Sequence, residues 1–297
     1  MSGANGKPTA RKRDTRKREI RPVRQPYAHA VAAARELCAP LGMREPRDVD
    51  VEALAYLKGA LVVPSRAPRG EGHLLRDRAT GAAIIAVRDV FYGTPKGRFI
   101  TAHETGHLLL HPDLDALPRC TGTVERLPPG ARRLEGEASD AGCEIVMPEA
   151  WFTRALGAGA PAFDHLRAMA SHFDVSLTAT ALRALQFVTT PCAFVVAKAG
   201  QVSWWACSEG WDVYVHRRAA IPERTASAAA ARGVDVPRGG VAVAGAAWGD
   251  VVGDVELREE VLAAKGEDVV LAWMTRVPSR ADAVLARADA LYGAEQS

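Results

Sequence analysis

The stretch RFITAHETGHLLLHP, residues 98–112, constrains this chain more strongly than any other. Apolar residues and histidines recur there every three or four positions, and Pro112 prevents continuation, so the pattern predicts a helix. Residues four apart lie one turn apart on one helix face, so His103 and His107 can direct ring nitrogens to a single point. Glu104 is offset around the helix, beside that point. The pattern indicates a divalent-metal site with Glu104 as its general base; the alternative is a helix with two ordinary histidines.

Such a site needs a further protein ligand, because zinc is four-coordinate and a catalytic zinc keeps one position for water. His111 continues the same stripe, but it lies about 12 Å along the helix axis from His103, too far to share one ion. The next helical pattern, LEGEASDAGCEIVMP, offers Glu135 and Glu137 after a loop long enough to fold back. Two residues apart on a helix, they point about 200° apart. Only one can face the metal, and the spacing leaves both open.

The rest of the chain combines short strands with helices. Before the motif, ALVVPS, GHLLRD and AAIIAVRD are apolar, β-branched-rich runs that predict strands, the last two joined as a hairpin by RATG. After it, FDHLRAMASHF and LTATALRALQF, joined by DVS, predict two further helices. From Pro191 onward CAFVVAK, QVSWWACS, WDVYVHRR and EDVVLAWMTRV predict strands, and SRADAVLARADALYG a closing helix. We therefore expect an α+β fold in which a small sheet precedes the motif helix.

These features together resemble the ImmA/IrrE zinc metallopeptidases. The resemblance lies in the Arg-Phe entry to the motif helix, the His-Glu-x-x-His core, and a downstream Glu-x-x-Ala helix ending in Met-Pro, here EGEASDAGCEIVMP. In that family the zinc-binding glutamate lies three residues before the alanine, so matching Ala138 gives this role to Glu135. Members commonly have Asn-x-Phe-Ala after this alanine where this chain has SDAG, which alters the packing of the helix. The resemblance covers roughly residues 27–190.

The resemblance implies a zincin-like, gluzincin-type endopeptidase core in which His103, His107 and Glu135 bind Zn²⁺ and water fills the fourth position. Glu104 would take a proton from that water as it attacks the scissile carbonyl, and pass it to the leaving amine. Tyr92 is a candidate for stabilising the oxyanion. Family members typically cleave an Xre-type helix-turn-helix repressor and so derepress stress-response or mobile-element genes. The expected partner is therefore such a repressor.

Charge is unevenly placed along the chain. Nine Lys and Arg fall within residues 1–25, against Asp14 and Glu19, in a run poor in apolar residues. Such a run is typically disordered; it could bind DNA, although a solvated tail is the favoured interpretation. The helices after the core resemble the helix-turn-helix segment of some members, and other members add a sensory-type domain. We expect four parts: a disordered basic arm at 1–25, a zinc metallopeptidase domain at 26–160, a helix-turn-helix-like segment at 161–190, and a β-rich α/β domain at 191–297.

Hydropathy and cysteine usage indicate the cellular compartment in which the protein is expected. Nothing before Pro26 offers a signal-peptide core, and no later stretch reaches the ~18 apolar residues of a membrane helix, so a cytoplasmic protein with no membrane contact is expected. The five cysteines are dispersed and form no CxxC pair, which argues against a disulfide framework and against a cysteine zinc knuckle.

The leading alternative is a DNA-binding transcription regulator with a structural or vestigial zinc site, which would use the basic arm and the helices within 163–186. However, the would-be recognition helix, LTATALRALQ, carries one cationic side chain, Arg183, where DNA reading usually enlists several. Packing against the core is therefore the favoured role. A toxin-antitoxin or phage-defence component that processes another partner needs the same metal site, so the sequence does not separate it from a repressor protease.

Overall fold

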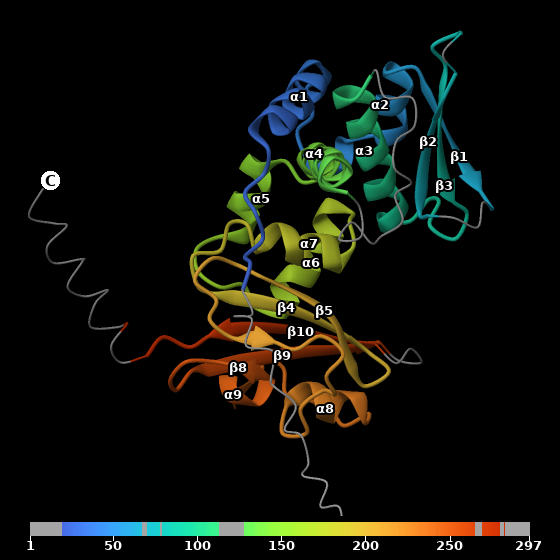
Figure 1. Cartoon of the computed structure of the whole chain (residues 1–297). Helices are drawn as coiled ribbons and strands as arrows, with labels where there is room; N and C mark the ends of the chain where they lie inside the picture. The colour runs from blue at the N-terminus through green and yellow to red at the C-terminus, as the bar shows by residue number, and fades with distance from the viewer. Residues whose placement is uncertain are drawn as a thin grey trace, which may run out of the picture.

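The computed structural model describes residues 20–66, 70–77, 79–112, 128–264, 269–279 and 282. These residues form an α+β fold, as predicted, with a small sheet at one side, helices in the middle, and a larger sheet at the other side (Figure 1). The predicted closing helix lies outside the described residues apart from Ser279 and Asp282. No helix among the described residues is long and apolar enough to cross a membrane.

The smaller sheet has three strands, β1 (Ala60–Ser65), β2 (Gly72–Arg76) and β3 (Ala83–Arg88), in the order β1-β3-β2. β2 and β3 pair antiparallel, which confirms the predicted hairpin, whereas β1 pairs parallel to β3. Pro64 is tolerated in β1 because this strand lies at the sheet edge, where a missing N–H breaks no ladder. Ile85 and Val87 of β3 are buried against Ile100 and Leu108 of the motif helix, which fixes that helix on the sheet.

The motif helix, α3 (Pro95–Leu110), confirms the sequence prediction and has clear start and stop signals. Thr94 precedes it and its Oγ1 accepts a hydrogen bond from the Gly97 N–H, while Pro95 occupies the first position, where no N–H is needed. The helix ends at Leu110, before Pro112. The second helix of the site is α4 (Pro129–Val146), which ends before Pro148 and is followed by α5 (Glu149–Leu156).

Two further helices precede the smaller sheet in the chain and pack against α3 and α4. They are α1 (Ala28–Cys38), which packs on α4, and α2 (Val51–Leu57), which is capped by Asp50 and leads into β1; short 3-10 turns lie at Ala39–Leu41 and Pro46–Asp48. Gly42 adopts a positive φ of 58° after the first of these turns, as a helix-terminating glycine should.

The helices α6 (Phe163–Phe173) and α7 (Leu177–Ala184) lie between α4–α5 and the larger sheet (Figure 1). Asp174 makes the turn between them in the left-handed region, and Ser176 caps α7 through the Ala179 N–H. No residue of α7 is exposed, and Arg183 has 1% of its surface accessible. This helix therefore packs against the core, as predicted, and its one cationic side chain is buried.

The larger sheet is antiparallel throughout, in the order β5-β4-β10-β9-β7. Alternate residues of β4 face opposite ways, so that Phe194 and Val196 pack towards α6 and α7 while Ala193 and Val195 face a second core. The elements of this part are β4 (Cys192–Lys198), β5 (Gln201–Cys207), β6 (Tyr214–Val215), α8 (Ala226–Ala231), β7 (Val241–Ala244), α9 (Gly245–Trp248), β8 (Gly249–Asp250), β9 (Glu256–Ala264) and β10 (Val269–Arg276). The expected strand WDVYVHRR is reduced to the two residues of β6, which pair with β8.

The described end of the basic arm, residues 20–25, runs in irregular conformation from the larger sheet to α4. The Val23 N–H donates to the Cys207 carbonyl of β5 at 2.7 Å. The Arg24 guanidinium donates to Asp140 of α4 at 2.7 Å and to the Gly136 carbonyl at 2.9 Å. This short segment therefore ties the two sheet-containing halves of the molecule together.

Candidate metal centre

Small residues let α3 and α4 approach closely. A Cβ at Gly106 of α3 would lie 2.7 Å from the Ala138 carbonyl oxygen, and one at Gly142 of α4 would lie 2.9 Å from the His103 nitrogen. Both separations are shorter than a carbon atom normally tolerates, so each position accepts only glycine without displacement of a helix. The SDAG sequence that departs from the family pattern thus supplies one of the two glycines of this contact.

This close contact brings two imidazoles and a carboxylate together. His103, His107 and Glu135 each offer one ligand atom, and these atoms lie within 4.8 Å of one another. Nε2 of His103 is 3.4 Å and Nε2 of His107 is 3.6 Å from the Glu135 carboxylate. Two ligands of a tetrahedral zinc, each about 2.0–2.1 Å from the ion, lie about 3.3 Å apart. The donor types and their spacing therefore fit a zinc-sized cation.

The charges of the three groups are coupled. Burial would raise the pKa of Glu135, but the two neighbouring imidazoles lower it to about 2. Burial lowers the pKa of His107 to about 4, so this imidazole is neutral at pH 7 and its ring can present a lone pair. Burial also lowers the pKa of His103, but the adjacent carboxylates of Glu135 and Glu104 outweigh it and the pKa is raised overall. The raised pKa of His103 favours a proton on its ring beside Glu135, and a bound cation would replace that proton.

Glu104 follows His103 on α3 and is also buried, with 1% of its surface accessible. It lies under the first residue of β2: a Cβ at Gly72 would be 2.8 Å from the Glu104 Oε1 and 2.3 Å from the Ile100 Cγ2. A glycine at this position lets the edge strand approach the glutamate. No sequence pattern singles out Gly72, because the contact joins segments distant in the chain.

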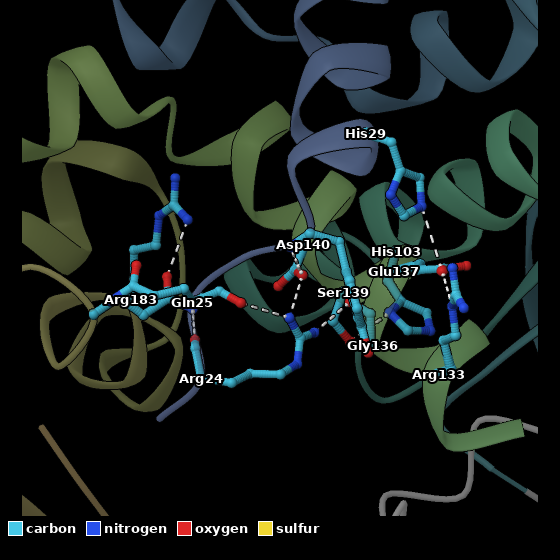
Figure 2. Close-up of polar contacts among 12 residues, drawn as sticks. Arg24, Gln25, His29, His103, Arg133, Gly136, Glu137, Ser139, Asp140 and Arg183 are labelled. Carbon is cyan, nitrogen blue, oxygen red and sulfur yellow. Dashed lines mark hydrogen bonds and ion pairs between the residues drawn. The ribbon is translucent and has the colours of Figure 1, made fainter. Parts of the chain in front are cut away.

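Hydrogen bonds hold both histidine rings from behind. The Ser139 hydroxyl lies 3.2 Å from the His103 Nδ1, as Figure 2 shows. The His107 Nδ1 lies 3.0 Å from the His111 Nδ1, and the His111 Nε2 lies 2.9 Å from the Glu137 carboxylate. Each ring thus presents Nε2 towards Glu135 and uses Nδ1 for a supporting contact. Such supporting contacts fix the orientation of metal-binding histidines.

Comparison with known proteins agrees with this geometry. Residues 59–185 match the family model Peptidase_M78, the IrrE N-terminal-like domain, and this range contains both helices of the site. The chain carries an ImmA/IrrE-family domain. The ImmA/IrrE resemblance inferred from the motif helix is thereby confirmed, and with it a general assignment to a peptidase family. No curated protein matches the chain significantly.

The fold extends beyond the ImmA/IrrE domain. A solved structure described as a Mycobacterium tuberculosis transcriptional regulator is similar over 84% of this chain and 76% of its own, with a TM-score of 0.51 and 17% sequence identity. At this identity the similarity concerns the fold alone. Because it covers most of this chain, it necessarily extends past residue 185, where the family match ends.

Not every residue singled out from the sequence joins the ImmA/IrrE site. The structure brings His103, His107 and Glu135 together, with Glu104 beside His103, whereas Glu137 faces His111. The His111 ring lies outside the ligand set, as expected, and contacts His107 and Glu137. Sequence reasoning missed Ser139, and it considered Glu137 only as an alternative ligand and not as a supporting residue. The i,i+4 spacing of Glu135 and Ser139, and of His107 and His111, was the available signal. The Tyr92 hydroxyl donates to Glu52 at 3.3 Å, and its oxyanion role stays untested.

Proposed function

We propose that this protein is a zinc-dependent endopeptidase in which His103, His107 and Glu135 hold the ion and Glu104 is the general base. The observation that carries the proposal is the convergence of three buried donors within 4.8 Å, with a second buried carboxyl group, that of Glu104, directly after His103 on α3. Exposed clusters of histidines and carboxylates occur on protein surfaces without any metal. Here the groups are buried together, and Gly72 lets the edge strand β2 approach them closely.

In the proposed mechanism the residues of the site have separate roles. A bound zinc would lower the pKa of a water molecule and polarise a peptide carbonyl. Glu104, held beneath Gly72, accepts a proton from the attacking water and delivers it to the leaving amine. Ser139 and His111 hold the two imidazoles in the orientation that presents Nε2. The exposed edge of β2 is the part of the sheet nearest Glu104, and a substrate backbone can pair along it.

We further propose that the substrate is an Xre-type helix-turn-helix repressor in the cytoplasm, whose cleavage derepresses stress-response or mobile-element genes. The family resemblance supports this substrate class, and the regulator-like structural neighbour is consistent with a role in transcription. We propose the same division of the chain as expected from the sequence: a zincin-like core at 26–160, a helix-turn-helix-like segment at 161–190 and a sensory-type domain at 191–297. In this arrangement the segment at 161–190 connects the two domains, since α6 and α7 pack against the core and the larger sheet.

The decisive experiment combines metal analysis with cleavage. Protein purified without chelators should contain about one zinc per chain by elemental mass spectrometry, and Glu135→Ala should lose it. Glu104→Gln should keep the zinc yet no longer remove the intact band of a co-expressed Xre-type repressor. Zinc-free protein that takes up none on addition would contradict the zinc site. Undiminished cleavage by Glu104→Gln would contradict the mechanism, and an intact repressor beside active, zinc-loaded enzyme would contradict the substrate.

The alternative function, a DNA-binding regulator, is disfavoured by the burial of α7 and by the engagement of Arg183 with Glu144. The basic arm remains the other source of DNA affinity. A test should delete only residues 1–19, because Arg24 and Val23 contact the fold. Duplex binding that falls steeply with salt and disappears on this deletion would favour a DNA-binding arm. A toxin-antitoxin or phage-defence role would instead appear as cleavage of a different partner by the same site.

A further inference from the structure

A chain of buried polar side chains extends from the proposed zinc site into α4. It begins at His107, whose Nδ1 is 3.0 Å from the His111 Nδ1, and continues from the His111 Nε2 to Glu137 at 2.9 Å. The other Glu137 oxygen accepts from Arg133 at 2.6 Å and lies 3.3 Å from His29 of α1 (Figure 2). His107, His111 and Glu137 are all buried, whereas Arg133 is largely exposed.

Proton positions along this chain follow from its chemistry. Two Nδ1 atoms that face each other need one proton between them, so one ring donates and the other accepts. Glu137 faces two basic groups, Arg133 and His29, and as a carboxylate it only accepts. The His111 Nε2 must therefore carry a hydrogen, and a ring with one hydrogen on Nε2 offers its Nδ1 as the acceptor. The His107 Nδ1 then carries the shared hydrogen, and the His107 Nε2 is left with the lone pair that faces Glu135.

We infer that His111 and Glu137 are positioning residues that fix His107 in the tautomer able to bind zinc. This inference rests on the zinc site proposed above. It explains why α4 carries two buried carboxylates two residues apart: Glu135 faces the ion, and Glu137 faces away and sets the hydrogen-bond direction through His111. Arg133 and His29 hold Glu137 ionised and in place. His103 receives the equivalent support from the single hydroxyl of Ser139.

The inference predicts different outcomes for two substitutions of similar size. Asparagine at position 111 can place its carbonyl oxygen where the His111 Nδ1 lies and so accept from His107, whereas leucine offers no acceptor. His111→Leu should weaken zinc binding about 10- to 100-fold, the usual effect of losing a supporting contact. His111→Asn should retain most of the affinity. Glu137→Gln, which keeps an acceptor oxygen but loses the charge, should fall between the two.

Zinc affinity should be measured by competition with a chromophoric chelator, on full-length protein. Long-range ¹H–¹⁵N spectra of the zinc-free protein supply a second readout: the His107 hydrogen should sit on Nδ1 in the wild type and in His111→Asn, and shift to Nε2 in His111→Leu. His172→Leu and His172→Asn serve as matched controls, since His172 is exposed on α6, and neither should change affinity. Urea unfolding with excess chelator checks that each variant folds.

The outcomes separate this inference from the proposed function. Zinc bound by the wild type with equal affinity in His111→Leu would overturn the positioning role and leave the zinc site standing. Equal losses in His111→Leu and His111→Asn, with no change of tautomer, would assign position 111 a purely structural role. Absence of zinc binding by the wild type would remove the proposed function itself. If His111→Leu fails to fold, Glu137→Gln and its tautomer spectrum decide the matter.

Discussion

The two helix pairs α3–α4 and α6–α7 both bury polar side chains, but they use them differently. In α3–α4 the glycines at 106 and 142 bring the backbones together, and ligand atoms from both helices converge on one point. In α6–α7 the buried polar group is Arg183, whose guanidinium donates to Glu144 at 2.8 Å and to Gln186 at 3.0 Å. A buried cation with its own carboxylate is structural, whereas two imidazoles and a carboxylate that converge on one point can hold a metal ion.

This difference shows which kind of sequence motif is the stronger indicator of function. The helix-turn-helix-like pattern of α6–α7 is a matter of helix lengths and a short turn, and the same lengths serve a connector packed on both sides. The motif of α3 specifies side-chain chemistry, and both of its histidines contact the carboxylate of Glu135 on a second helix, α4. Chemistry that two elements must satisfy together indicates function more strongly than the outline of one helix pair.

Removal of the buried cation should have the largest effect. Arg183→Leu leaves Glu144 buried with only Arg35 as a cationic partner, and loss of one member of a buried pair costs about 3–5 kcal/mol. Since Arg35 remains, we expect about 3 kcal/mol in the free energy of unfolding, measured in urea with the metal removed. Arg167→Leu, an exposed arginine on α6, is the matched control with a change below about 0.5 kcal/mol. Equal stability of the two variants would show that α7 is not held by this pair.

Forcing α3 and α4 apart should come next. Gly142→Ala places a Cβ 2.9 Å from the His103 nitrogen and 3.0 Å from its Cα, so the helices must separate by a few tenths of an ångström. We expect a destabilisation of about 1–3 kcal/mol and weaker zinc binding by the same protein. Gly130→Ala in the first turn of α4, where a Cβ meets nothing within 4 Å, should stabilise by up to about 1 kcal/mol. Unchanged zinc affinity in Gly142→Ala would mean that the close helix contact does not set the site.

Loosening the segment that joins the sheet to α4 should have a smaller effect. Arg24 is 44% exposed and its partner Asp140 is 6% exposed, so the ion pair is partly screened by solvent. Asp140 also keeps the Tyr27 N–H at 2.8 Å in the variant Arg24→Gln. We therefore expect a loss of about 1 kcal/mol or less in unfolding free energy, and no loss of zinc. A loss above about 2 kcal/mol would give this segment a larger role than its exposure allows.

Local patterns predicted local structure well, and long-range contacts poorly. The α3 helix, the β2–β3 hairpin and the end of α4 at Pro148 depend on neighbouring residues, and all three are as predicted. The parallel pairing of β1 with β3 joins segments whose register no local pattern encodes. The short β6 has the alternation of a longer strand, but its neighbours follow irregular backbone, with the Trp211 Nε1 donating to the Val213 carbonyl.

The candidate site shows the same division. Spacing alone placed His103, His107 and Glu104, because all three lie on one helix. The choice between Glu135 and Glu137 needed the family register, since helix geometry allows either to face the motif; the structure places Glu135 with the histidines. The contacts of Ser139 and His111 depend on how deeply α4 packs into α3, which is set by single glycines.

The cysteine thiols have the smallest effect at neutral pH, and their contribution to stability changes only at high pH. Burial raises the pKa of Cys143 on α4 to about 11 and that of Cys192 on β4 to about 12, above the unfolded value near 8.5. A raised pKa means that the neutral thiol's contribution to stability is complete below about pH 8.5 and is lost as pH rises through the folded pKa. Unfolding free energy should therefore not respond to these thiols at pH 7–8. It should fall above about pH 9, by up to about 1.4 kcal/mol per pH unit for each thiol.

Cys192→Ala should flatten this decline in urea titrations up to pH 11, while its stability at pH 7 falls by the cost of a small cavity. The positive charge of Arg183 on α7 lowers the pKa of Cys143 on α4. Arg183→Leu should therefore raise the pKa of Cys143 further, which would show that the two helix pairs are electrostatically coupled. An unchanged alkaline profile in Cys192→Ala would show that other groups dominate the decline.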